Sequence, residues 1–129
     1  VEQAKQNAGL EIMAEELVEA AVLLEKVTLK LGALAMEKGA GAYMADATRY
    51  LEMFSIIVVA WQWLTMALAA SVKLEKEVKK KTDQRFYEGK IYVAQYFFSH
   101  ELVKIHGISD TLCRTDKVTL AMPDDCFTD

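Results

Sequence analysis

Twenty consecutive residues, from Met53 to Val72 (MFSIIVVAWQWLTMALAASV), carry no formal charge and would be apolar on every side of a helix. At about 1.5 Å per residue such a helix is roughly 30 Å long, which suits either a membrane span or the central helix of a bundle. The sequence of the remaining segments indicates which of these two folds the chain adopts.

The segment before this run has the pattern of an amphipathic helix. Its apolar residues recur at steps of three and four, while glutamates occupy the other positions. The stripe consists of Leu10, Met13, Leu17, Ala21, Leu24, Val27, Leu31 and Leu34. We expect a helix over residues 8–38, ended by Gly39, since glycine adopts positive φ angles without strain.

A second helix is predicted over residues 44–81 and includes the apolar run. One stripe along it, taken as the core face, consists of Tyr50, Phe54, Ile57, Trp61, Leu64 and Leu68. A second stripe lies on the opposite side and consists of Ile56, Val59, Trp63, Met66 and Ala70. A helix with two apolar sides has more apolar surface than two neighbouring helices can cover.

A third helix is predicted over residues 83–108, with Thr82 or Asp83 as its N-cap and Gly107 as a possible stop. Its stripe consists of Tyr87, Ile91, Ala94, Phe98, Leu102, Ile105, Ile108 and Leu112. Residues 113–129 contain the lone proline, Pro123, and are expected to pack on the bundle as an irregular tail.

The three predicted helices favour an all-α fold, an elongated antiparallel three-helix bundle, over a membrane protein. A single membrane span would leave the two amphipathic helices without a partner, whereas a bundle buries all three stripes together. With 129 residues the chain is one domain by length. It has no initiator methionine and no signal-peptide pattern, so we interpret it as a fragment of a longer cytoplasmic protein.

Charge and cysteine content give little sign of a nucleic-acid or metal-binding protein. The formal net charge is -4, which does not favour binding to nucleic acid or to an anionic membrane. Cys113 and Cys126 cannot form a structural zinc site alone and are expected to be reduced thiols. The sequence from His100 to Lys104 begins like the zinc motif H-E-x-x-H, but Lys104 replaces the second histidine.

No catalytic, cofactor-binding or metal-binding residue is identified. The Glu-x-x-His motif of di-iron bundles is absent, because Phe97 and Val103 stand three residues before His100 and His106. Nucleophile elbows, Walker loops and dinucleotide-binding glycine motifs are absent too.

The second and third helices nevertheless resemble the C-terminal domain appended to larger bacterial acyl-CoA dehydrogenases. The resemblance rests on a spaced set of residues in each helix. These are Asp46-Ala47, Tyr50-Leu51, Phe54, Trp61-Gln62-Trp63 and Met66-Ala67, followed by Phe86-Tyr87, Lys90, Phe97-Phe98 and a closing segment from Leu120 to Phe127. Ser55 and Val103 depart from the pattern, where glycine and proline are expected.

The resemblance implies a parent flavoenzyme that uses FAD to oxidise the α and β carbons of an acyl-CoA, an oxidoreductase of fatty acid metabolism. The FAD and acyl-CoA sites and the catalytic base would lie upstream, so no cofactor is expected in this fragment. Its expected partners are the upstream catalytic domains of the same chain and other subunits of a homo-oligomer. An independent protein-interaction module, which uses its apolar and lysine-rich parts, is the alternative; a single-span membrane segment is a weaker one.

One candidate interface follows from the two-sided second helix. The stripe opposite the predicted core face would then face away from the bundle. We expect it to contact either the catalytic core or a second subunit. The candidate interface residues are Ile56, Val59, Trp63 and Met66. In the isolated fragment this face is expected to form a two-fold dimer that buries Trp63, while Trp61 is expected in the core.

Overall fold

The computed structural model describes the backbone of residues 2–76 and 80–128, and side chains from Asn7 onward within those ranges. The fold is all-α: 88% of the described residues are helical and none of them forms a strand. The predicted fold class is therefore confirmed.

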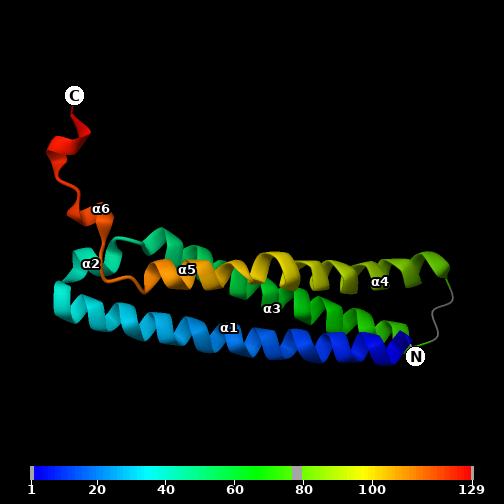
Figure 1. Ribbon diagram of the computed structural model, residues 1–129. Helices are drawn as coiled ribbons and strands as arrows, with labels where there is room; N and C mark the ends of the chain where they lie inside the picture. Colours follow the sequence, from blue (N-terminus) through cyan, green and yellow to red (C-terminus); the bar gives the residue numbers. More distant parts are fainter. Residues whose placement is uncertain (1, 77–79, 129) are drawn as a thin grey trace.

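Three long rods lie side by side and run alternately up and down the molecule (Figure 1). The first is α1 (Glu2–Lys38) and the second is α3 (Ala47–Glu75). The third is built from α4 (Lys81–Tyr96), a π-helical segment (Phe97–Leu102) and α5 (Lys104–Leu112). At 37 residues, α1 is about 55 Å long, so the bundle is elongated as expected.

The helix boundaries differ from the predicted ones at several places. The helix α1 begins at Glu2 and not at residue 8, but it ends at Lys38 before Gly39, whose φ of 90° requires glycine. A short helix, α2 (Ala40–Met44), follows before α3 starts. The helix α3 ends at Glu75, and residues 77–79 of the predicted extension to residue 81 lie outside the described residues.

The third rod is longer than predicted, because it begins at Lys81 and continues through Gly107 to Leu112. Neither Thr82 nor Asp83 caps it, since Lys80 occupies the N-cap position without a side-chain hydrogen bond. Gly107 does not stop the helix because nothing forces a positive φ there. The buried Ser109 and Leu112 beyond it hold the last turns on the bundle.

The core joins one face of each rod, and the stripes predicted for the first and third rods are largely confirmed. On α1 the buried large residues are Leu10, Met13, Val27, Leu31 and Leu34, although Ala20 is buried in place of Ala21. On the third rod the buried residues include Ile91, Ala94, Phe98, Leu102, Ile105 and Leu112. Tyr87 and Ile108 are partly buried against this core.

The inner face of α3 is formed largely by small residues. Ala60 and Ala67, seven residues apart, have no exposed surface, and Ala70 is also buried. Leu64 lies between these two alanines, and Met53 and Ile57 precede them on the same face and complete the stripe. Alanine at the contact lets neighbouring helices approach closely, and this sets the rotation of α3 in the bundle.

Only the first part of the predicted tail, residues 113–117, packs on the bundle: Cys113 lies against the core and Lys117 is buried. After α5 the chain forms two short helices, α6 (Val118–Ala121) and a 3-10 turn (Asp124–Phe127), which rise sideways from the rods at the end where α2 lies (Figure 1). Every described residue after Lys117 is exposed. With four residues each, these helices have too little apolar surface to hold the segment against the rods.

Lys117 is the point at which the chain after α5 is attached to the bundle. Its side chain is 6% exposed, and the ammonium group donates hydrogen bonds to Asp46 Oδ2 at 2.8 Å and to the Leu112 carbonyl at 3.2 Å. Asp46 precedes α3, so this ion pair connects the start of the second rod to the end of the third.

Substitution of Ala60 tests the close packing of α3. We expect Ala60→Leu to lower the free energy of unfolding by about 1–3 kcal/mol, because the added atoms have no space in a dense core. Urea denaturation followed by circular dichroism measures the change. Ala14→Leu, at an exposed position of α1, is the matched control and should change stability by less than about 0.5 kcal/mol. Equal effects of the two substitutions would show that Ala60 is not closely packed.

The Asp46–Lys117 pair is tested by a double-mutant cycle. We expect Asp46→Ala to cost about 3 kcal/mol in urea denaturation, because it leaves a buried ammonium group without its counterion. The double variant Asp46→Ala/Lys117→Met should lose less stability than the sum of the single variants. Additive losses would show that the two side chains are not coupled.

Candidate interaction surface

The four predicted interface residues lie on the side of α3 that faces α4. Ile56 and Trp63 are half-buried and pack against the core, whereas Val59 and Met66 are exposed. The stripe is therefore only partly free, because the third rod covers one edge of it. The expectation that Trp63 points fully outward does not match this packing.

The indole of Trp63 is covered by a cation from α4. Lys90 Nζ lies 6.0 Å from the centre of the Trp63 ring and 5.0 Å from that of Phe86, within the range of a cation–π contact. Phe86 in turn packs edge-to-face on Tyr87, with ring centres 5.5 Å apart. These contacts tie the middle of α3 to the first turns of α4.

A shallow groove of about 230 Å³ lies between α3 and α4 beside these residues. Its floor is apolar and its rim carries two lysines. The lining residues are Met66, Ala69, Ala70, Lys73, Phe86, Tyr87 and Lys90. Among the four predicted interface residues, only Met66 lines it.

The position of Trp61 contradicts the prediction that this side chain lies in the core. Trp61 is 56% exposed, and Phe54 and Leu68 of the same predicted core stripe are 44% and 49% exposed. Only Ile57 and Leu64 of that stripe are fully buried, with Tyr50 partly buried. The reason is the rotation of α3 about its own axis. Because Ala60 and Ala67 contact the neighbouring rods, the side chain of Trp61 faces solvent.

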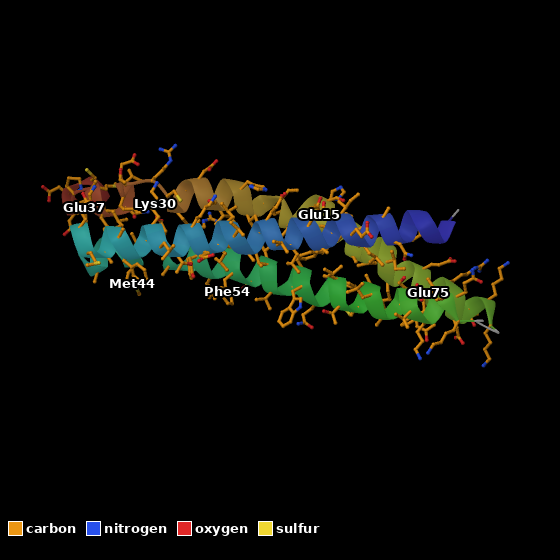
Figure 2. The ribbon with its side chains drawn as sticks, turned by 90° about the horizontal axis from the view of Figure 1, so that it is seen from below. Glu15, Lys30, Glu37, Met44, Phe54 and Glu75 are labelled. Carbon is orange, nitrogen blue, oxygen red and sulfur yellow. The ribbon has the colours of Figure 1, made fainter. Side chains whose placement is uncertain are left out.

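These exposed residues form a continuous stripe that we call the outer seam. It follows α3 at alternating steps of three and four and consists of Leu51, Phe54, Val58, Trp61, Thr65, Leu68 and Val72. All seven are exposed, and six are large and apolar. Figure 2 shows Phe54 on the edge of α3 that is turned away from the other rods. The alanines at seven-residue spacing were the sequence signal that could have identified this outer face.

Titratable groups gather in one smaller cavity, of about 160 Å³, between α1 and the third rod. Glu16, Glu19 and His106 lie in its lining. Partial burial raises the pKa of Glu16, and the neighbouring charge of Glu19 raises it further. Among residues 2–76 and 80–128, no group of three or more His, Cys, Asp or Glu is placed to hold a metal ion.

The residues that begin like a zinc motif make local contacts along the third rod. His100 stacks on Tyr96 at 4.4 Å between ring centres, and Lys104 Nζ donates to Glu101 Oε2 at 2.5 Å. This hydrogen bond is the main reason that the pKa of Lys104 is raised. Cys113 and Cys126 are both free thiols.

The two tryptophans should differ in fluorescence. At low protein concentration, Trp61 alone, in the Trp63→Phe variant, should emit at longer wavelength and be quenched more strongly by acrylamide, since it is exposed to water. Trp63 alone, in the Trp61→Phe variant, should be shielded by Lys90 and the core. Equal quenching of the two variants would contradict this placement.

Comparison with known proteins identifies one protein family that matches this chain. The family model described as "Acetyl-CoA dehydrogenase C-terminal like" matches residues 1–123. No match was found among curated proteins or among solved structures.

Proposed function

Because the chain belongs to the acetyl-CoA dehydrogenase C-terminal-like family, we propose that it is the non-catalytic helical domain of an FAD-dependent acyl-CoA dehydrogenase. The observation that carries this proposal is the family match over residues 1–123, which includes all three rods. In this proposal the domain supports the catalytic core or its oligomer, in the cytoplasm.

The chemistry of the described residues supports a non-catalytic role. Removing hydrogens from two adjacent carbons requires a bound redox cofactor and a positioned base. The cavities beside Glu16, Leu34 and Met66 measure about 160, 190 and 230 Å³, below the roughly 300–1,000 Å³ of typical ligand sites. In this proposal a flavin and an acyl-CoA are bound upstream, by the rest of the parent chain.

The groove between α3 and α4 is the surface that we assign to the catalytic core. Met66 and Phe86 offer exposed apolar side chains there, 39% and 60% exposed. Lys73 and Lys90 at the groove can pair with acidic groups on the partner. An apolar centre with a charged rim is typical of contacts between protein domains.

The membrane alternative is disfavoured by the place of α3 in the bundle. Among the described residues, α3 is the helix long and apolar enough to cross a membrane by length and composition. It packs against α1, α4 and α5, however, and its inner face forms the centre of the core. In the proposed domain the apolar run is thus the central helix of the bundle.

An independent interaction module remains the second candidate, favoured by the exposed Phe86 and the lysines beside it. The length of the reading frame upstream of Val1 distinguishes the two proposals. A reading frame continuous with Val1 that encodes an upstream flavin-binding dehydrogenase supports the accessory domain. A start codon directly before Val1 would overturn it in favour of the independent module.

The isolated chain should bind neither FAD nor acyl-CoA. We expect purified protein incubated with FAD to show no flavin absorbance after gel filtration, and no reduction of an electron acceptor with acyl-CoA present. A parent enzyme truncated before Val1 is the matched control and should retain its flavin, with reduced thermal stability. Stoichiometric flavin on the isolated chain would contradict a non-catalytic role.

A further inference from the structure

The outer seam of α3 has the spacing of a helix-pairing surface. Successive residues of the seam are separated alternately by three and four positions over three heptads, from Leu51 to Val72. This spacing is the pattern of a coiled-coil seam. The inner face of α3 has the same spacing and is fully used by the bundle. The helix therefore carries two pairing faces, and among the residues that the structure describes only the inner face has a partner.

From this second face we infer that the outer seam binds the outer seam of a second copy of this chain, in antiparallel orientation about a two-fold axis near the middle of α3. This proposal does not depend on the activity of the parent enzyme. It also differs from the predicted dimer interface, because it buries Trp61, leaves Val59 exposed and leaves Met66 free for the groove surface.

The area of the seam is sufficient for a specific dimer. Its six apolar residues are between 37% and 63% exposed. With side chains of about 150–250 Å² for the aromatic ones and somewhat less for the others, they offer roughly 500–600 Å² per copy. Two copies, with the polar residues beside the seam, reach the lower end of the roughly 1,200–2,000 Å² found in stable interfaces.

Side-chain volumes complement one another in the antiparallel arrangement. In such a pair, the first and fourth positions of opposing heptads face each other. Phe54 then faces the partner's Val72, and Val58 faces the partner's Leu68. Trp61, the largest side chain of the seam, faces the partner's Thr65, the smallest. Larger side chains thus meet smaller ones in the layers from Phe54 to Val72, while Leu51 at the end of the seam lies opposite the partner's Glu75.

The charged residues of α3 lie mostly away from the seam. Arg49 and Glu52 stand one heptad before Ile56 and Val59, on the side that faces α4, and they pair with each other at 2.8 Å. Lys73 lines the groove between α3 and α4. The seam is thus uncharged from Leu51 to Val72, and its orientation follows from the side-chain volumes.

The first test is the mass of the isolated chain in sedimentation equilibrium. We expect a concentration-dependent dimer of twice 14.5 kDa, and acrylamide quenching of Trp61 that falls as the dimer forms. Trp61→Glu should raise the dissociation constant by roughly a hundredfold or more without loss of helicity. Val59→Glu on the same helix and Leu29→Glu on α1, where Leu29 is 68% exposed, are the matched controls and should remain dimeric.

The second test fixes the orientation by cross-linking, in a Cys113→Ala/Cys126→Ser background. Gln62→Cys should form a disulfide-linked dimer, since it lies beside the two-fold axis. Ser55→Cys should do so only when Ala69→Cys is also present. A chain that stays monomeric at high concentration, a dimer that survives Trp61→Glu or is lost in Val59→Glu, or efficient cross-linking of Ser55→Cys alone would overturn the proposal.

Discussion

The close contact of α3 with its two neighbouring rods is the constraint on which the rest of the structure depends. Ala60 and Ala67 have no exposed surface, and a larger side chain at either position would push the rods apart. Because these alanines fix the rotation of α3, they also decide which of its many apolar residues face water. The position of Trp61 in solvent, and of Trp63 under Lys90, follows from two small side chains rather than from the tryptophans themselves.

The first and third rods could be predicted well from the sequence, and α3 could not. An amphipathic stripe such as Leu10, Met13 and Val27 has one apolar side, so the buried face is unambiguous. The uncharged run of α3 is apolar on every side, so its periodicity fits several rotations equally well. Choosing the rotation by placing the largest residues inside was wrong, because close helix contacts favour small ones.

A long-range ion pair and the short helices of the tail account for the other differences between the predicted and the observed structure. Lys117 is buried because its partner Asp46 is supplied by a segment 71 residues earlier in the chain, which no local pattern reveals. The tail beyond it was expected on the bundle because it alternates polar and apolar residues. Its two helices of four residues each are too short to form an apolar face, and it projects into solvent.

The π-helical segment between α4 and α5 has a consequence for how this rod can vary. A π turn holds one more residue than an α turn, so the rod can change its residue count there without interrupting the helix. The buried Ile91 and Ala94 on one side and Ile105 and Leu112 on the other can each keep their own rotation toward the core. The third rod is thus two helices joined in line, and a related chain could insert or delete a single residue at Phe97–Leu102 and retain both contacts.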